Sequence, residues 1–322
     1  MTEPVNSRTR LMIAGLALML FVALNRSAVA QSDTKSALNF ETASDRVVLT
    51  HSGKPIADFV FVDPKILRPH IANVRLKSQR QVTRRQPPLA VKDATDHADM
   101  HPGVWLAFGD INGHDFWRNK ARIEHLHFTQ QPAVAQGRVS FTTRSRLRGN
   151  QDELLGHLDH HLTAEDRPQG WRLIWEATFI ADAGDLIFGD QEEMGFGARV
   201  ATEVTEKNGG VILNSDGLRT AKATWGKPAA WCDYTGTIDG TPCGVTLMTA
   251  PSNFRPSWWH NRDYGLVVAN AFGRAAMKQG EKSQVTVKPG ESLKLIYAAT
   301  FHEGADYDPA REYGSFLSAL KL

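Results

Sequence analysis

The stretch that decides the fold is Trp171-Arg172-Leu173-Ile174-Trp175-Glu176-Ala177-Thr178-Phe179-Ile180. Trp171, Leu173, Trp175, Ala177 and Phe179 recur at every second position. Successive side chains of a β-strand point to opposite faces, so this period of two is typical of a strand with one buried face. We therefore predict a strand of about ten residues here.

The same pattern recurs on both sides of this stretch. Strands are predicted at residues 46–50, 57–62, 138–142, 244–248, 283–288 and 292–300. Turn signals separate the runs, among them residues 51–55, Asn208-Gly209-Gly210, Asp239-Gly240 and Pro289-Gly290. Because no strand–helix alternation is present, the pattern favours an antiparallel sandwich. We predict an all-β fold, a large antiparallel β-sandwich with the build of the galactose-mutarotase supersandwiches.

One short helix is predicted at the C-terminal end. Asp308 can cap it, and Pro309 suits its first turn. An apolar face follows from the spacing i, i+3, i+4, i+7, and its members are Tyr313, Phe316, Leu317 and Leu320.

Residues 1–30 have the features of a secretory signal peptide. Arg8 and Arg10 precede an uncharged run at residues 11–24, and Ala28-Val29-Ala30 follows. The run has 14 residues, fewer than the roughly 20 that a spanning helix needs, although an uncleaved anchor is the alternative. We expect cleavage after Ala30, a periplasmic or secreted protein, and no membrane insertion after cleavage. Residues 31–45 are predicted to be loosely ordered, and 46–322 to form a single domain.

Charge argues against a nucleic-acid partner. Residues 1–30 hold three Arg and one Glu, so the remaining chain has 34 basic and 34 acidic side chains. A neutral chain lacks the electrostatic footprint of a nucleic-acid binder. Residues 77–85 are a local exception, with four cations in nine residues. They form either a solvated face or a docking site for an anionic group.

The chain has two cysteines, Cys232 and Cys243, and the sequence does not decide whether they form a disulfide. An oxidising compartment would allow them to pair. However, a tight hairpin closed at Asp239-Gly240 places Cys243 opposite a residue near Gly236 and not opposite Cys232. Two isolated thiols without a CxxC motif do not indicate redox catalysis.

Two segments concentrate ionisable and aromatic side chains. We call residues 96–117 the early loop and residues 257–265 the late loop. The early loop reads DHADMHPGVWLAFGDINGHDFW, and the late loop reads SWWHNRDYG. We predict that the two loops meet in the fold and line one concave site.

Three histidines in these loops are the candidate catalytic residues: His97, His101 and His260. Imidazole titrates near neutrality, so each can act as a general acid or base. His97 and His101 are also candidate ligands of a divalent metal, because imidazole and carboxylate suit zinc, manganese or iron. No cofactor is certain, and both interpretations stay open.

Aromatic and polar residues of the same region suit a carbohydrate cleft. Indole faces stack on sugar rings, while polar groups bind the hydroxyls at their rims, and ligand pockets generally mix apolar walls with a few polar groups. The candidate substrate-binding residues are Trp105, Asp110, Asn112, Glu192, Asp233, Trp259, Arg262 and Asp263. Arg262 and Asp263 can alternatively form a mutual ion pair, or Arg262 can bind a carboxylate such as a uronate.

These motifs also resemble a family. The matching segments are similar to exported bacterial PmoA-like proteins, and they are residues 101–117, 225–226, 231–236, 251–253, 259–265 and 269–273. The resemblance covers most of the chain and implies a domain of unknown function. Its methane-oxygenase label does not fit, because that enzyme subunit consists of spanning helices. The sequence departs from the pattern at Met100 and at residues 248–250, which weakens an inherited metal site.

The sequence therefore indicates an exported protein that acts on or binds carbohydrate or another small polar ligand. An enzyme would use lyase-, epimerase- or hydrolase-type acid/base chemistry. A non-catalytic carbohydrate binder and a structural envelope protein are the alternatives. No phosphate loop, dinucleotide fingerprint or HExxH motif occurs, which argues against nucleotide and redox cofactors.

We expect the mature chain to begin at Gln31. N-terminal sequencing of protein recovered from the periplasm or medium checks this, because signal peptidase cuts after the small-residue triplet. A chain that keeps residues 1–30 in the membrane fraction would instead support the uncleaved anchor.

Overall fold

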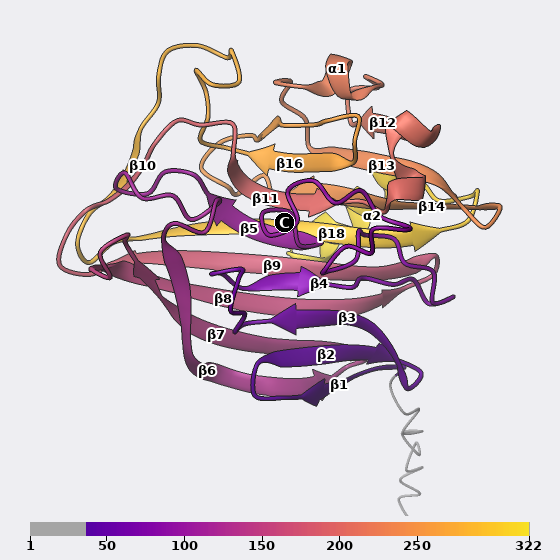
Figure 1. Ribbon diagram of the computed structural model, residues 1–322, viewed down its shortest axis with the longest axis horizontal. Helices are drawn as coiled ribbons and strands as arrows, with labels where there is room; N and C mark the ends of the chain where they lie inside the picture. Colours follow the sequence, from indigo (N-terminus) through magenta and orange to yellow (C-terminus); the bar gives the residue numbers. More distant parts are fainter. Residues whose placement is uncertain (1–36, 322) are drawn as a thin grey trace, which may run out of the picture. The chain divides into compact units, whose positions relative to one another are not determined.

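Two eight-stranded antiparallel sheets form the structure, a computed structural model that describes residues 37–321 (Figure 1). The first sheet has the order β1 (Leu38–Thr42), β2 (Arg46–His51), β3 (Lys54–Val60), β4 (His70–Ala72), β5 (Val104–Phe108), β11 (Met194–Arg199), β16 (Leu266–Asn270) and β15 (Trp258–Trp259). The second has the order β12 (Val211–Asn214), β13 (Trp231–Ile238), β14 (Thr241–Thr249), β18 (Ser292–Glu303), β9 (Gly170–Ala181), β8 (Leu154–Arg167), β7 (Arg138–Arg148) and β6 (Arg122–Ala135).

Few other elements occur in this part of the chain. A two-stranded pair joins β10 (Leu186–Phe188) to β17 (Val285–Val287). The helices are the short α1 (Ala221–Thr224), α2 (Pro309–Ala319), and two 3-10 turns, η1 (Thr202–Val204) and η2 (Glu206–Asn208). Between residues 37 and 321, no helix has the length and apolar character that a membrane span needs. The predicted all-β antiparallel sandwich with a short C-terminal helix is confirmed.

The core lies between the two sheets and is built on the stretch that the sequence singled out. In β9 the side chains of Trp171, Leu173, Trp175, Ala177 and Phe179 all belong to the main hydrophobic cluster. Aromatic rings of the first sheet pack against these side chains of β9. The ring centroids of Phe196 and Trp175 are 5.9 Å apart, and those of Phe108 and Phe179 are 5.1 Å apart, nearly perpendicular. Such edge-on contacts add to the stabilisation from burial alone.

Helix α2 covers the outer face of the second sheet. Asp308 caps it by accepting hydrogen bonds from the backbone N–H groups of Ala310 and Arg311. Phe316 is fully buried and packs against Trp231, Met248 and other residues on that outer face. The sheet therefore buries apolar surface on both sides, against the first sheet and against α2.

The next feature is the N-terminal part of the chain, residues 1–45. The predicted signal peptide and residues 31–36 lie outside the described residues. The loosely ordered segment predicted for 31–45 is wrong for its second half. There β1 pairs with β2 from Leu38 to Thr42, because the buried Leu38 anchors the strand in the core.

The two cysteines stay apart. In the β13–β14 hairpin Cys243 is the partner of Gly236, and Cys232 is the partner of Leu247, as the asymmetric turn predicted. Both thiols are free and buried, and burial raises the pKa of Cys243 to about 11. Neither thiol is set up as a nucleophile at neutral pH.

Replacing the central indole should be the most damaging single truncation in the core. We expect Trp175→Ala to lower the free energy of unfolding by about 3–5 kcal/mol, because the cavity lies where both sheets contribute rings. Val91→Ala is the control, since Val91 is 91% exposed and should change stability by less than about 0.5 kcal/mol. Urea unfolding followed by tryptophan fluorescence measures both. Equal effects would contradict the placement of this core.

Candidate functional site

The early and late loops meet on the outer face of the first sheet. A pocket of about 210 Å³ lies between them. It is lined by His97, Met100, His101, Trp117, Arg118, Glu193, His260, Arg262, Tyr264 and Leu266. Beneath it a second apolar cluster contains Trp105, Ala107, Trp117, Leu266 and Val268, separate from the sandwich core. The predicted convergence of the two loops is confirmed.

His101 sits in a column of parallel rings. Its imidazole stacks on Trp105 with centroids 5.2 Å apart and planes 5° apart. His97 covers the other face at 5.0 Å, and Tyr264 follows at 6.2 Å from His97. Because both ring faces of His101 are occupied, only the edge of the imidazole can reach a ligand.

The tautomer of His101 is set by Arg199. A guanidinium nitrogen of Arg199 lies 3.2 Å from Nδ1 of His101. Guanidinium only donates hydrogen bonds, so Nδ1 accepts and the proton of the neutral ring resides on Nε2. Burial, reinforced by the positive charge of Arg199, lowers the pKa of His101 well below its usual value. His101 therefore offers a neutral N–H donor.

His260 has the opposite tautomer. Paired backbone hydrogen bonds with Val268, of 2.9 and 3.2 Å, place His260 on the outer face of the sheet. Its Nδ1 lies 2.9 Å from the backbone carbonyl oxygen of Glu192, which can only accept, so Nδ1 donates. In the neutral ring Nε2 therefore carries a lone pair. Burial, and next the charge of Arg262, lower the pKa of His260.

Buried arginines hold the start of the early loop. Arg84 donates to the backbone carbonyl oxygens of His97 and His101, at 3.2 and 3.0 Å. Arg199 donates to the carboxylate of Asp96 at 2.7 Å. Burial opposes ionisation of Asp96, but its bonds to Arg199 and His97 keep its pKa below the usual range. This network keeps the His101 edge in a defined position.

Two ion pairs form the rim. Arg262 donates to a carboxylate oxygen of Glu192 at 2.8 Å, and the same oxygen is 3.5 Å from Nε2 of His260. Arg118 pairs with Glu193 at 3.0 Å. The mutual pair considered for Arg262 and Asp263 is wrong. Asp263 lies 3.7 Å from Lys207, with its side chain 53% exposed.

The two predicted stacking tryptophans do not face the pocket. Trp105 and Trp259 both have an exposed fraction of 0%. Trp105 is the floor under His101. Trp259 precedes His260 on the chain, so strand alternation turns its indole inward to the sandwich core, where Nε1 donates to the carbonyl of Ala229 at 3.1 Å. The prediction that either indole contacts a sugar directly is therefore wrong.

Three predicted polar ligands also lie elsewhere. Asp110 accepts a hydrogen bond from the N–H of Gly113 and closes a turn. The side chain of Asn112 bonds the backbone of Asp185 and Ile187, 2.8 Å each, and ties the early loop to β10. Asp233 belongs to the second sheet. It is held there by Thr246 at 2.7 Å and by His302 at 2.9 Å.

Arg199 is the most important residue that the sequence reasoning missed. Its signal was a single cation at the end of an otherwise apolar strand, Met194–Arg199. Arg118, Glu193, Tyr264 and Leu266 also line or flank the pocket without having been singled out. The tertiary fold brings their side chains to the pocket, and the sequence around each of them does not indicate this.

The metal hypothesis is not supported by this arrangement. The rings of His97 and His101 are stacked face to face, and Nδ1 of His101 faces a guanidinium. The lone pair of an imidazole nitrogen lies in the plane of the ring. Lone pairs of two stacked, nearly parallel rings therefore do not converge on one ion. Among residues 37–321, no three His, Cys, Asp or Glu side chains are grouped in a way that would hold a metal ion.

Comparison with known families decides the classification. Residues 46–313 match the "Family of unknown function (DUF6807)". The chain belongs to this family. The PmoA-like resemblance is therefore wrong, since no methane-oxygenase family matches. No curated protein matches the chain significantly.

Solved structures similar to this chain include a galactose mutarotase-like protein from Clostridium acetobutylicum. It shares 10% identity at a TM-score of 0.41, over 83% of this chain and 98% of that one. A galactose mutarotase-like protein from Lactobacillus casei shares 10% at 0.39, over 82% and 100%. A putative aldose 1-epimerase from Escherichia coli K12 shares 10% at 0.32, over 82% and 98%. These likenesses concern the fold alone.

The buried neutral histidines should make the protein acid-sensitive. Below about pH 6.5 the unfolded state binds a proton at His101 that the folded state excludes, so stability present above this pH is lost as pH falls. We expect His101→Asn to reduce the slope of unfolding free energy against pH, between pH 5 and 6, by about 1.4 kcal/mol per pH unit.

Urea titrations at several pH values measure this slope. Leu266→Ala is the control: it removes a buried apolar side chain of the same cluster and should lower stability by the same amount at every pH. An unchanged slope in His101→Asn would show that His101 is protonated in the folded protein.

Proposed function

We propose that this protein is a carbohydrate-active enzyme whose pocket binds one sugar ring and moves a proton on it. The observation that carries the proposal is the pair of neutral imidazoles of opposite tautomer in one pocket. His260 supplies a lone pair on Nε2, while His101 supplies an N–H on Nε2. A base and a hydrogen-bond donor are the two groups that proton abstraction beside a carbonyl requires.

The size and lining of the pocket support a small polyhydroxylated ligand. Its volume of about 210 Å³ is below the range typical of drug-sized ligands, roughly 300–1,000 Å³, and suits a single ring. Met100 and Leu266 offer apolar contact to the C–H groups of the ring. Arg118 and Glu193 line the pocket with charged groups that can form hydrogen bonds with hydroxyls.

The proposed step begins with a C–H bond next to a carbonyl or carboxylate of the sugar. Nε2 of His260 takes the proton, the electron pair of the C–H bond forms a C=C bond to the carbonyl carbon, and the π pair of the C=O bond moves onto the oxygen. The N–H of His101 stabilises the charge on that oxygen. A neutral imidazole in this role parallels other enzymes in which a histidine is kept uncharged so that it can polarise a carbonyl.

Two outcomes are compatible with this step. In elimination, the electron pair returns and expels the oxygen on the next carbon, which leaves with a proton from water. In epimerisation, water delivers a proton to the opposite face of the carbon. Both belong to the lyase and epimerase classes.

Hydrolysis is less well supported. Glycoside hydrolases use two carboxyl groups, one of which must donate a proton to the leaving oxygen. In this pocket Glu192 bonds Arg262 and Glu193 bonds Arg118. Each carboxylate is thus engaged by a guanidinium, and neither is presented as a proton donor.

Arg262 is the proposed orienting residue. Its side chain is 35% exposed, and it reaches the pocket from the late loop, next to His260. A planar guanidinium can hold a carboxylate of a uronate ring through two hydrogen bonds. Such a contact would place the C–H next to that carboxylate near Nε2 of His260 and would make it more acidic.

The decisive variant is His260→Gln. We expect it to lower kcat by about 10²–10⁴-fold, the usual contribution of a general base, with ligand affinity changed by no more than a few fold. His127→Gln is the matched control. It removes an exposed imidazole of β6 in the second sheet, outside the pocket, and it should keep most activity.

The assay is a panel of uronate-containing and neutral glycans, with products detected by mass spectrometry and by exchange of deuterium from solvent. Full turnover in His260→Gln would overturn the assignment of the base. Binding without turnover or exchange for every glycan would instead identify a non-catalytic carbohydrate binder. An absence of any glycan binding would favour a structural envelope protein.

A further inference from the structure

A second pocket adjoins the pocket between the early and late loops, which we call the histidine pocket. We call the second one the Trp225 pocket, and its volume is about 430 Å³. Arg262 lines both pockets. The other lining residues of the Trp225 pocket are Glu206, Ala221, Lys222, Trp225, Asn261 and Asp263. Because the two pockets share a side chain, a ligand that fills one can extend into the other.

The indole of Trp225 offers a surface on which a ligand can pack. Trp225 ends α1, where its backbone N–H donates to the carbonyl of Ala221 at 3.0 Å. The cationic groups of Arg262 and Lys278 lie 5.9 and 5.6 Å from the centroid of the indole. Cation–π attraction at such distances helps to hold the ring in position. The side chain remains partly exposed, so part of the indole is open to a ligand.

Two buried polar atoms at this pocket have no hydrogen-bond partner among residues 37–321. They are Nε1 of Trp225, which is a donor, and Oδ1 of Asn261, which is an acceptor. The amide nitrogen of Asn261 is already bonded to Thr224 at 2.8 Å. A buried polar atom without a partner costs free energy. Hydroxyl groups would satisfy both atoms, since a hydroxyl can accept one hydrogen bond and donate another.

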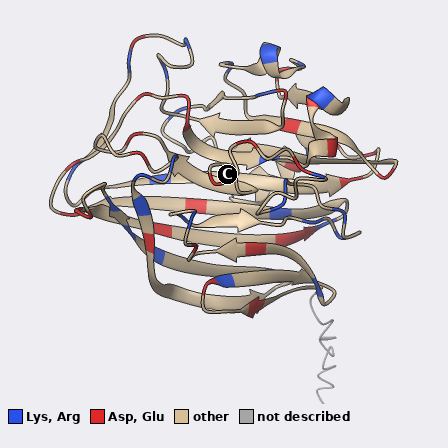
Figure 2. Ribbon diagram, in the orientation of Figure 1, with Lys and Arg blue, Asp and Glu red and all other residues tan. Residues whose placement is uncertain are grey.

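The charges around the Trp225 pocket are balanced. Lys222 and Arg262 contribute positive charge, and Glu206 and Asp263 contribute negative charge. Lys and Arg are likewise interspersed with Asp and Glu along the strands and loops (Figure 2). A site that attracts ions is lined by one sign of charge. The lining of this pocket therefore favours a neutral, polar ligand.

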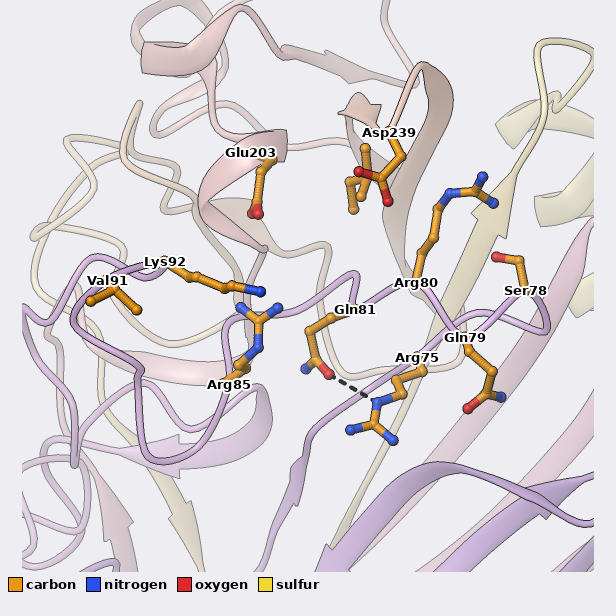
Figure 3. Close-up of a pocket in the computed structure, with 11 residues that line it drawn as sticks. Arg75, Ser78, Gln79, Arg80, Gln81, Arg85, Val91, Lys92, Glu203 and Asp239 are labelled. Atoms are coloured by element: carbon orange, nitrogen blue, oxygen red, sulfur yellow. Dashed lines mark hydrogen bonds between the residues drawn. The ribbon is translucent and has the colours of Figure 1, made fainter.

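A larger groove, of about 1,040 Å³, lacks these features (Figure 3). None of its 11 described lining side chains is aromatic. Two of its cations, Arg80 and Arg85, are paired with carboxylates, and Glu203 and Asp239 line the groove as well. Its lining favours no particular class of ligand.

We propose that the Trp225 pocket binds a neutral sugar ring of a glycan whose uronate ring occupies the histidine pocket. The indole packs on C–H groups of the neutral ring, and hydroxyls supply the missing partners of Trp225 and Asn261. The inference rests on the proposed function for the choice of the uronate. It adds that the substrate is a glycan of at least two rings and not a free monosaccharide.

Arg262 connects the two pockets physically. One of its nitrogens bonds the Glu192 oxygen that lies 3.5 Å from Nε2 of His260. Its guanidinium is also the group that faces the indole of Trp225. A glycosidic bond joins adjacent rings directly, so two pockets that share one side chain suit adjacent rings of one glycan.

The test is titration calorimetry with matched pairs of ligands. Each pair consists of glucuronate or galacturonate and the disaccharide in which that uronate is linked to glucose, galactose, xylose or rhamnose. We expect at least one disaccharide to bind about tenfold more tightly than its monosaccharide, a ratio that corresponds to about 1.4 kcal/mol. Trp225→Ala should abolish this gain and leave the affinity for the monosaccharide within about twofold, because binding energy is concentrated in such anchors.

Asp263→Ala tests the same pocket without disturbing the core. The side chain of Asp263 is 53% exposed, and it lines the Trp225 pocket and not the histidine pocket. Its loss should weaken binding of the disaccharide and not of the monosaccharide. Trp258→Ala is the matched control, since it removes a partly exposed indole of the late loop that lines neither pocket. It should leave the gain unchanged.

Three results would overturn the proposal. The first is a panel in which no disaccharide binds more tightly than its monosaccharide. The second is a gain that survives in Trp225→Ala, or a loss there that is equal for both members of a pair. The third is a gain for phenyl glucuronide as large as that of the best disaccharide, which would assign the pocket to an apolar aglycone and not to a sugar.

The same titrations in His260→Gln separate this proposal from the catalytic one. We expect the gain to be the same in this variant, because His260 does not line the Trp225 pocket. If the gain is present and turnover also persists, the assignment of the base has failed and the second sugar site has not. If turnover is lost as expected but no disaccharide gains affinity, the second sugar site has failed alone.

Discussion

The buried guanidinium of Arg199 is the interaction on which the site depends. One charged group sets the tautomer of His101, anchors Asp96 and lies 4.5 Å beneath the ring of Tyr264. Burying a cation is costly unless hydrogen bonds and a counter-charge compensate it. Here Asp96 and His101 of the early loop provide the compensation. The same contacts of Arg199 therefore hold the loop in place and keep His101 neutral.

Strand alternation turns the first sheet into two different surfaces. Its inner face contributes aromatic rings to the sandwich core, while its outer face presents Trp105, Arg199 and His260 to the loops. The close packing of this outer face needs small residues. A Cβ at Gly197 would lie 2.9 Å from the indole of Trp105, so only glycine lets the ring lie across β11. The aromatic floor of the pocket therefore depends on a residue without a side chain.

Charge is balanced within the histidine pocket. In the histidine pocket every cation has a partner, and the result is a neutral, pre-organised site where burial keeps imidazoles uncharged.

The sequence alone determined the class of fold, because hydrophobic period and turn residues are local properties. It predicted the strand at residues 171–180, the capped helix after Asp308 and the offset of the two cysteines. It also predicted that the early and late loops converge, since both concentrate ionisable side chains that a folded protein places at a common site. These features follow from short-range preferences and composition.

Only the tertiary structure decided which side chains face the pocket. Trp259 and His260 are adjacent in sequence and point to opposite faces of one sheet. Asp233 belongs to the other sheet, and Arg199 comes from a strand that carried no motif. Which face of a strand is covered by a loop, and which cation finds a carboxylate, depends on contacts between segments far apart in the chain. Burial and charge pairing are properties of those contacts, so no local pattern reports them.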